Sequence, residues 1–361
     1  MINSIKLQGF RNFKLKKFEF SPDTSLILGP NASGKTNLLE SLYFLSAAKS
    51  FKAKIEEEVI SYEKDIARIE GQISDSKSEE NDLEIIITRG QIDIGAVRPE
   101  KAPRKKLLLN GIPKRGIDFA GNFRVVLFGP WDMDLVTEAP TVRRKFLDMV
   151  LSQVNREYRR SVLSYEKGLR QRNRVLWNIR EGNVGRDRLL FWNQLLIKNG
   201  DYISESRREF IENTNKNNFS PKDIDDADSF SKLQLEYDPS VISEGRLEQY
   251  KDEEVASATT LVGPHRDDFI FKRDGRSLSS FGSRGEQRMG VLWLKMAELA
   301  FVEQKTDERP TLLLDDIFSE LDDSHRGIVV QIANGQQTII TAVDDKFAKD
   351  LKKVNKIELI R

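Results

Sequence analysis

Two short stretches decide the fold: Gly29-Pro30-Asn31-Ala32-Ser33-Gly34-Lys35-Thr36, and Leu312-Leu313-Leu314-Asp315-Asp316. The first matches the phosphate-binding P-loop pattern Gly-x4-Gly-Lys-Thr. The second is an apolar run that ends in two carboxylates, a pattern typical of the Mg²⁺-binding strand of P-loop ATPases. We therefore expect one nucleotide site assembled from two distant parts of the chain. Most P-loop enzymes are excluded, because their metal carboxylate follows the loop much sooner.

The P-loop residues have distinct expected roles in binding ATP. Gly29 and Gly34 let the backbone bend so that its N–H groups face the phosphates, and Lys35 brings a positive charge to the β- and γ-phosphates. The Thr36 hydroxyl is a predicted Mg²⁺ ligand, and the helix that begins here adds its positive end. A chance glycine turn is the alternative interpretation. The order of a short apolar strand at 25–28, a loop and an amphipathic helix favours the nucleotide site.

The two carboxylates at the end of the second stretch have separate predicted roles. Asp315 is placed to hold Mg²⁺, directly or through water. Asp316 is placed to orient or deprotonate the attacking water. Many ABC-type ATPases carry Glu at this second position. Because Asp has a shorter reach, we expect slow turnover.

The third element is Ser283-Arg284-Gly285-Glu286-Gln287-Arg288. Ser283 and Glu286 have the spacing of a capping box, so a well-started helix is one explanation. The other is an ABC signature, in which Ser283, Gly285 and the helix N-terminus bind the γ-phosphate of a nucleotide held by the opposite subunit. Both can hold at once, and the accompanying motifs favour the signature.

Residues 317–322, Ile317-Phe318-Ser319-Glu320-Leu321-Asp322, match a D-loop, which crosses the dimer interface in such ATPases. An ABC-type switch histidine is expected near Thr341-Ala342-Val343. The two histidines of the chain are His265 and His325, and neither follows that strand. This is a second reason to expect weak hydrolysis.

Composition limits the function less than the motifs do. A chain of 361 residues is longer than one that usually folds around a single hydrophobic core, so one large domain or two lobes are expected. Lys plus Arg (58) nearly balances Asp plus Glu (57), so any contact with DNA must come from a local basic patch. Cysteine is absent, which excludes disulfides and thiolate metal sites. We see no signal peptide and no membrane span, and expect a cytoplasmic protein without a membrane partner.

The pattern along the chain predicts an α/β fold interrupted by helices. Strands are expected at 5–10, 13–20, 25–28, 66–73, 83–88, 106–109, 125–128, 269–271, 311–314 and 337–341, with an Asn110-Gly111 turn. From Trp131 to about Asn218 the periodicity becomes helical, and a long helix is expected from about Arg284 to Val302. We therefore predict an ATPase head at 1–130 and 256–361, and a mainly helical arm at 131–255.

These motifs, with several others, resemble the RecF family of bacterial recombination-repair ATPases, which are related to SMC heads. The resemblance spans nearly the whole chain. It rests on Gly9-Phe10-Arg11-Asn12-Phe13, 29–40 with Thr36-Asn37-Leu38-Leu39-Glu40, Ala48-Lys49-Ser50-Phe51-Lys52, Arg143-Arg144-Lys145-Phe146-Leu147-Asp148, Gln171-Arg172-Asn173-Arg174-Val175-Leu176, Gly263-Pro264-His265-Arg266-Asp267-Asp268 and 314–322. The ordered set is more specific than the Walker motifs alone.

The resemblance implies an ABC-type, SMC-like P-loop ATPase head with an inserted helical arm. It implies an ATP-dependent homodimer that binds double-stranded DNA, gapped or with a junction, and acts with RecR to help load RecA at gaps during DNA repair and replication. It further implies weak, DNA-stimulated ATP hydrolysis. By the same resemblance, Asp316 and the missing histidine are normal, and Arg11, Asn12 and Asn37 join the nucleotide site.

Three alternative functions agree less well with the sequence. An OLD-type or other SMC-like head serving a nuclease or defence complex usually carries an appended nuclease domain, for which we see no spare segment. The large insertion argues against the ATP-binding subunit of a transporter. A small-molecule kinase is disfavoured because no motif for binding a phosphate acceptor accompanies the P-loop.

Three basic clusters are candidates for contact with the backbone of duplex DNA: Arg143, Arg144 and Lys145; Arg170, Arg172 and Arg174; and Lys101, Arg104, Lys105 and Lys106.

Overall fold

The computed structural model describes residues 1–75, 78–92, 100–217, 230, 232–319, 321 and 323–359. The chain forms two compact units. Unit 1 contains Met1–Asp132 and Glu298–Arg361, and unit 2 lies between Met133 and Ala297. The assignment of 1–130 and 256–361 to a head and of 131–255 to an arm stays a prediction.

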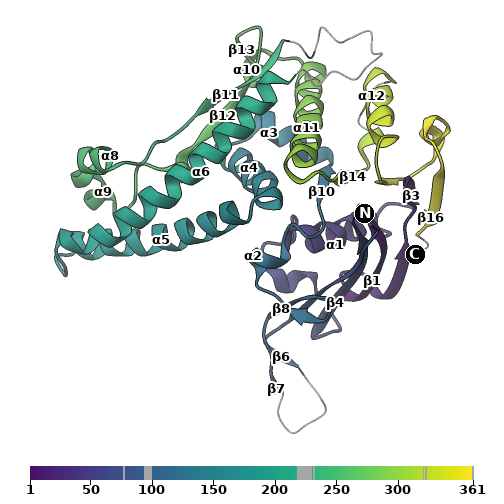
Figure 1. Cartoon of the computed structure of the whole chain (residues 1–361), viewed down its shortest axis with the longest axis horizontal. Coiled ribbons are helices and arrows are strands. Elements are labelled where there is room, and N and C mark those ends of the chain that lie inside the picture. The colour runs from purple at the N-terminus through teal and green to yellow at the C-terminus, as the bar shows by residue number, and fades with distance from the viewer. Residues whose placement is uncertain are drawn as a thin grey trace. The chain divides into compact units, whose positions relative to one another are not determined.

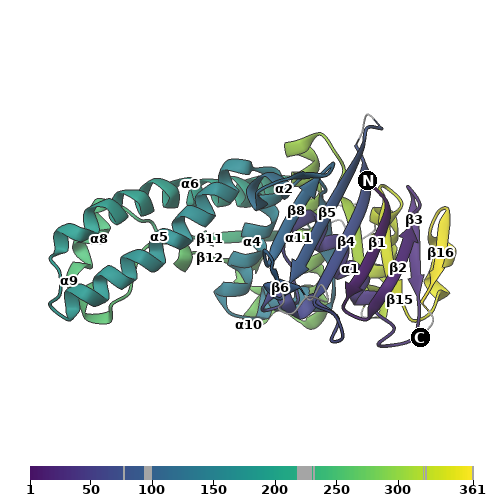
Figure 2. The ribbon, with the colours of Figure 1, turned by 90° about the horizontal axis from the view of Figure 1, so that it is seen from below.

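Unit 1 contains an antiparallel and a parallel sheet. The antiparallel sheet has the order β2-β1-β4-β5-β8-β9, and Figure 2 shows β8, β5, β4, β1 and β2 side by side in that order. Its strands are β1 (Ile2–Phe10), β2 (Phe13–Glu19), β4 (Ile66–Ser74), β5 (Glu80–Thr88), β8 (Lys105–Leu109) and β9 (Ile112–Pro113). A small ladder joins β6 (Gln91–Ile92) to β7 (Glu100–Lys101). The predicted Asn110-Gly111 turn between β8 and β9 is confirmed, with both residues at positive φ.

The parallel sheet brings distant parts of the sequence together. Its order is β10-β14-β15-β3-β16, so β3 lies beside β15 and one strand away from β14. The strands are β3 (Thr24–Leu28), β10 (Val125–Phe128), β14 (Thr311–Asp315), β15 (Thr338–Ala342) and β16 (Val354–Glu358). The carboxyl ends of parallel strands share one edge of a sheet, where α/β proteins place their ligands. The P-loop follows the carboxyl end of β3, and Asp315 is the last residue of β14.

Helix α1 (Lys35–Ala47) contacts strands of both sheets, β10, β14 and β15 of one and β4 and β5 of the other. Its Leu38, Leu39, Leu42 and Leu45 are buried as the periodicity predicts, but Tyr43 and Phe44 are buried as well. A helix enclosed between two sheets has no solvated face, so it is apolar around most of its circumference. Further helices in the described part of unit 1 are α2 (Gly116–Phe119) and α12 (Asp323–Ala333).

Buried Gln337, just before β15, ties the first strand to the parallel sheet. Its side chain accepts a hydrogen bond from Ile2 N at 2.8 Å and donates one to Ile2 O at 2.7 Å. Its amide oxygen also accepts from the Thr311 hydroxyl at 2.8 Å. A buried amide with its partners satisfied on three segments helps to specify one arrangement of those segments.

Unit 2 combines helices with the antiparallel sheet β11-β12-β13. Its elements are α3 (Asp134–Thr137), α4 (Pro140–Val154), α5 (Arg156–Arg180), α6 (Leu190–Lys216), β11 (Leu233–Asp238), α8 (Glu244–Gln249), α9 (Lys251–Ser257), β12 (Asp268–Arg273), β13 (Arg276–Ser277) and α10 (Leu278–Phe281). Helices α5 and α6 run side by side (Figure 1), and α4 and α6 contact the sheet. Helix α11 (Arg284–Thr306) begins in unit 2 and ends in unit 1. The predicted α/β fold with a helical insertion is confirmed.

Candidate nucleotide site

The P-loop joins β3 to α1 through a turn that requires glycine. Gly34 has a φ of +104°, and a Cβ there would lie 2.5 Å from the Asn12 side chain. Left-handed backbone and a close neighbour both exclude a larger residue. The Asn12 amide donates to Ser33 O at 3.1 Å and accepts from Asn37 at 2.9 Å. The structure therefore places Asn12 and Asn37 against the loop.

The two motifs converge at Thr36 and Asp315, 279 residues apart in sequence. The Thr36 hydroxyl lies 2.8 Å from Asp315 Oδ2 and 3.2 Å from Oδ1. Asp315 ends β14 and is only 4% exposed. A hydroxyl beside a buried carboxylate is an oxygen donor set of the kind that Mg²⁺ accepts.

Lys35 is the first residue of α1 and is buried against its own loop. Its ammonium donates to Gly29 O at 2.7 Å and to Pro30 O at 3.1 Å. The charge is thus held by the backbone of the loop itself, and the described structure gives Lys35 no salt bridge with a carboxylate. A lysine in this state is a positive charge available to an anion.

The Ser33 hydroxyl supports a ligand at this loop. It is buried, and within the described part of the chain it has no hydrogen-bond partner. Leaving a buried hydroxyl unpaired costs about 1–3 kcal/mol, so such groups in native proteins call for an explanation. A phosphate oxygen bound by the loop would give the hydroxyl a partner.

Asp316 begins the turn after β14, and Thr341 holds it there. Asp316 has a φ of +50°, and its N–H donates to Thr341 O at 3.2 Å and to the Thr341 hydroxyl at 3.0 Å. The same hydroxyl lies 2.7 Å from Asp315 Oδ1. One side chain on β15 therefore contacts both predicted catalytic positions.

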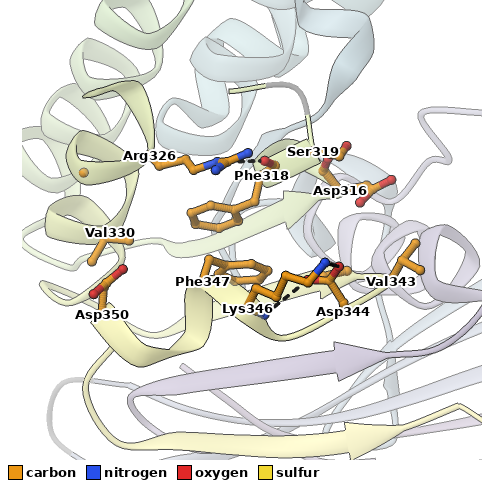
Figure 3. A pocket seen from close by; sticks show the side chains of 12 residues that line it. Asp316, Phe318, Ser319, Arg326, Val330, Val343, Asp344, Lys346, Phe347 and Asp350 are labelled. Carbon is orange, nitrogen blue, oxygen red and sulfur yellow. Dashed lines mark hydrogen bonds and ion pairs between the residues drawn. The ribbon is translucent and has the colours of Figure 1, made fainter. Parts of the chain in front are cut away.

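Asp316 lines a cavity of about 600 Å³ beside the site (Figure 3). Across it, the rings of Phe318 and Phe347 stack at 4.0 Å between centroids, and Arg326 donates to Phe318 O at 3.1 Å. The first D-loop residues form a 3-10 turn at Ile317–Ser319. Glu320 and Asp322 of the predicted D-loop lie outside the described residues. Exposed Val343 follows β15, at the place where an ABC-type ATPase is expected to carry its switch histidine.

Arg11 lies next to Asn12 in sequence, but its side chain binds Glu40 and Glu58 and not the P-loop. Its Nε and Nη2 donate to the two oxygens of Glu40 at 2.8 and 2.6 Å, and Nη1 donates to Glu58 O. Glu40 is fully buried in α1 and also accepts from the Ser50 hydroxyl. Arg11 and Asn12 are thus placed differently: Asn12 touches the P-loop and Arg11 anchors a bidentate ion pair.

The signature segment belongs to unit 2 and has a complete capping box. Ser283 N donates to Glu286 Oε2 at 2.7 Å, and Glu286 N donates to the Ser283 hydroxyl at 3.3 Å. The hydrogen bond from the Ser283 N–H, then that from its side chain, hold the pKa of Glu286 below its ordinary value. The capping explanation is confirmed. Ser283 and Gly285 are exposed, and the signature role stays a prediction.

The basic clusters divide into structural and exposed members. Arg143 is buried in a two-point ion pair with Asp268, with distances of 2.6 and 2.9 Å. Arg144 donates to Asp267 O at 2.8 Å, whereas Lys145 is exposed. Lys101 and Lys106 are exposed, while Arg104 and Lys105 pair with Glu57 and Glu56. Arg143 is therefore not a free cation for DNA.

Sequence reasoning missed Thr341 and Glu40. The signal for Thr341 is its register, because Asp315 and Thr341 are partners at the shared end of neighbouring parallel strands. The signal for Glu40 is a charged residue in the middle of a helix that is otherwise apolar. A charge buried there requires a partner, and that partner is Arg11.

The whole chain matches a known family model. Residues 1–361 match the RecF/RecN/SMC N-terminal domain. The chain is 35% identical to the DNA replication and repair protein RecF of Herpetosiphon aurantiacus, covering 96% of this chain and 94% of that protein. It is 34% identical to the RecF of Agathobacter rectalis, covering 99% and 96%.

Solved structures give the same result. The recombination mediator protein RecF-ATPrS in the RecFOR pathway superposes with a TM-score of 0.85 at 30% identity, covering 99% of this chain and 96% of that one. RecF-ATP in the same pathway gives 0.83 at 29%, covering 96% and 92%. An Smc head domain of Pyrococcus furiosus gives 0.53 at 15%, covering 99% and 94%, which extends the likeness of fold to SMC heads.

Proposed function

Because this chain belongs to the RecF family of SMC-like ABC-type ATPases, we propose that it is an ATP-dependent, double-stranded DNA-binding ATPase of recombinational repair. The observation that carries the proposal is the 2.8 Å approach of the Thr36 hydroxyl to Asp315. This contact unites a phosphate-binding loop with a metal carboxylate. The relatives cover at least 94% of the chain, which favours this function over an OLD-type head that serves a nuclease.

The P-loop binds the triphosphate. Backbone N–H groups of the loop face the phosphates, and Lys35 supplies positive charge to them. Thr36 and Asp315 would hold Mg²⁺, which neutralises charge on the β- and γ-phosphate oxygens when it is bound. The Ser33 hydroxyl, which has no partner in the described chain, supplies one more hydrogen-bond donor to the phosphates.

Asp316 orients or deprotonates the attacking water, in a position set by Thr341. A carboxylate shorter than Glu reaches the water less well, and the chain has no histidine after β15. Both features support slow hydrolysis, which suits a switch that resets a complex. We propose that bound DNA accelerates this step.

A second copy of the chain completes the site. Ser283, Gly285 and the start of α11 bind the γ-phosphate of the neighbouring subunit's nucleotide, so ATP joins two subunits. The ATP-bound dimer binds gapped or junction duplex in the cytoplasm and acts with RecR to help load RecA. Among the described residues, none of the helices has the length and apolar character needed to span a membrane.

Light scattering with and without ATP, repeated with a duplex that bears a single-stranded gap, tests the proposal. We expect the mass to double with ATP and the dimer to bind the duplex. Ser283→Arg should still bind ATP yet remain a monomer, because a large cation replaces a small donor. Normal ATP-dependent dimerisation of that variant contradicts the signature role, and failure of the wild-type dimer to bind duplex contradicts the proposed function.

A further inference from the structure

One exposed face of helix α5 collects cations along most of its length. Its members recur alternately every four and three residues, which keeps them on one side of a helix of 3.6 residues per turn. We call this set the α5 basic face: Arg156, Arg160, Leu163, Lys167, Arg170, Arg174 and Trp177. All seven residues are exposed, and Leu163 and Trp177 are 56% and 47% exposed.

Four cations of this face, Arg160, Lys167, Arg170 and Arg174, lack strong internal partners in the described part of the chain. Within the described part of the chain, Lys167, Arg170 and Arg174 take part in no salt bridge. Arg160 lies 3.7 Å from Glu157, and both side chains are more than half exposed. Exposed pairs of this kind contribute about 0–1 kcal/mol. These four cations therefore present charge of which the fold itself makes little use.

The neighbouring cation on the same helix shows the opposite behaviour. Arg172 is 1% exposed and donates to Glu254 at 2.6 Å, to Thr260 at 2.8 Å and to Asn193 at 2.8 Å. Two residues on either side, Arg170 and Arg174 lie on the outer face, because a step of two turns about half-way around a helix. The sequence cluster thus separates into one structural and two exposed arginines.

The adjacent helix α6 carries a different exposed surface. Its exposed residues include the carboxylates Asp201, Glu205, Glu209 and Glu212. Of its cations, Arg208 and Lys216 are paired with Glu205 and Glu212 at 2.7 and 3.2 Å, whereas Lys198 is exposed. The exposed surface of α6 is therefore a mixture of both charges, whereas the α5 basic face gathers cations on one side of its helix.

The length and chemistry of the α5 basic face suit duplex DNA. From Arg156 to Arg174 the helix advances about 27 Å at 1.5 Å per residue. A turn of duplex is about 34–36 Å, so the face can follow phosphates over most of one turn. Single strands are held by successive stacked aromatic rings, and this face has Trp177 alone at one end.

We propose that the α5 basic face binds the phosphate backbone of duplex DNA through Arg160, Lys167, Arg170 and Arg174. This assignment rests on the proposed DNA-binding function and adds the surface that performs it. The contacts are to phosphates, so they contribute affinity and salt dependence without sequence preference.

The first test compares two triple variants that lose the same charge. Lys167→Gln/Arg170→Gln/Arg174→Gln changes the α5 basic face, and Lys198→Gln/Arg208→Gln/Lys216→Gln changes α6. Duplex affinity with ATP is measured by fluorescence anisotropy at several salt concentrations. We expect the α5 variant to bind at least about tenfold more weakly, with a plot of log K against log salt less steep by about 2.7. The α6 variant should stay within about threefold of wild type.

The possible outcomes distinguish failure of the α5 basic face from failure of the DNA-binding function. Equal affinity and equal salt slope for wild type and the α5 variant would overturn the assignment while leaving the DNA-binding function intact. A wild-type protein that binds no duplex with ATP would overturn both. ATP-dependent dimerisation of the α5 variant, measured alongside, shows that it is folded.

A crosslinking experiment tests direct contact with the native fold. The chain has no cysteine, so a single introduced thiol is unique. Arg170→Cys labelled with a photoactivatable maleimide should crosslink to duplex when ATP is present, whereas Glu205→Cys on α6 should not. Crosslinking from residue 170 to a second copy of the chain in place of DNA would make the face a protein interface and overturn the proposal.

Discussion

The nucleotide site of unit 1 and a charged network of unit 2 differ in how their polar groups are paired. The network consists of Arg207, Asp148, Asp267 and Tyr237. At the site, Lys35 is held by loop carbonyls and the Ser33 hydroxyl has no partner in the described chain. In the network, Asp267 is fully buried and accepts from Arg207 at 3.0 Å, Tyr237 at 2.5 Å and Ser240 N at 2.7 Å. The first arrangement leaves interactions for a ligand, and the second uses its interactions to hold the fold.

The comparison explains why motifs of similar appearance have different roles. Gly263-Pro264-His265-Arg266-Asp267-Asp268 is one of the segments that, like the P-loop, carry the family resemblance. Its Asp267 and Asp268 instead bind Arg207 and Arg143 from α6 and α4. Gly263 has a φ of +127°, and a Cβ there would lie 2.1 Å from the Tyr165 hydroxyl. This motif joins the segments of unit 2.

The largest effect should come from breaking the network. Arg207→Met leaves buried Asp267 and half-buried Asp148 without their cation, so we expect the free energy of unfolding to fall by about 3–5 kcal/mol. Urea unfolding measures the loss. The control Arg208→Met removes a partly exposed cation, paired with exposed Glu205, from the next position and should change stability by less than about 0.5 kcal/mol. Similar losses in the two variants would show that burial does not distinguish them.

The network also predicts a pH dependence through His265. Burial, and secondarily the nearby Arg266 and Arg144, lower its pKa to about 4, although the hydrogen bond to Thr260 O opposes this. The folded protein then binds fewer protons than the unfolded chain between about pH 6.5 and pH 4. Stability is therefore complete above pH 6.5 and is lost as pH falls, by up to about 3 kcal/mol.

Urea unfolding of wild type and His265→Asn from pH 7.5 to 4.5 tests this dependence. The difference in unfolding free energy between the two proteins should shrink toward low pH, because only the wild type loses the contribution of His265. Parallel pH curves would mean that His265 titrates equally in the folded and unfolded states.

At the nucleotide site, the expected effect is on chemistry and not on folding. Lys35→Arg keeps a positive charge in the loop but moves it, so nucleotide should still bind while ATP hydrolysis falls at least about 100-fold, or about 2.7 kcal/mol in barrier. Phosphate release and equilibrium binding of ATP measure the two quantities. Arg208→Lys is a matched conservative change away from the site. Hydrolysis near the wild-type rate in Lys35→Arg would remove Lys35 from its assigned role.

The smallest effect tests the residue that links the two carboxylates. Thr341→Val preserves shape but removes the hydroxyl that contacts Asp315 and Asp316 N, so kcat should fall about tenfold, with ATP affinity within about threefold. Thr338→Val, on the same strand but away from the carboxylates, is the control. A rise in KM without a change in kcat would indicate that Thr341 acts in ground-state binding and not in positioning.

Much of the fold was predictable because its signals are local. The strand, loop and helix at 24–47 follow from apolar residues, two glycines and the helix that they start. Strand β14 follows from three leucines, and the Asn110-Gly111 turn follows from backbone preference. The burial of α1 on nearly all sides was not predicted, because it depends on two sheets that enclose it.

The sequence by itself determined which residues carry phosphate and metal chemistry, since Gly34, Lys35, Thr36 and Asp315 are chemically specialised and stand at fixed spacing. Tertiary structure alone decided which charges are used internally. Arg172 is buried because Glu254, 82 residues away, meets it, whereas Arg170 and Arg174 point outward on the same helix. Helical phase and long-range pairing fix the environment of a charge, and neither can be read from the identity of its neighbours in sequence.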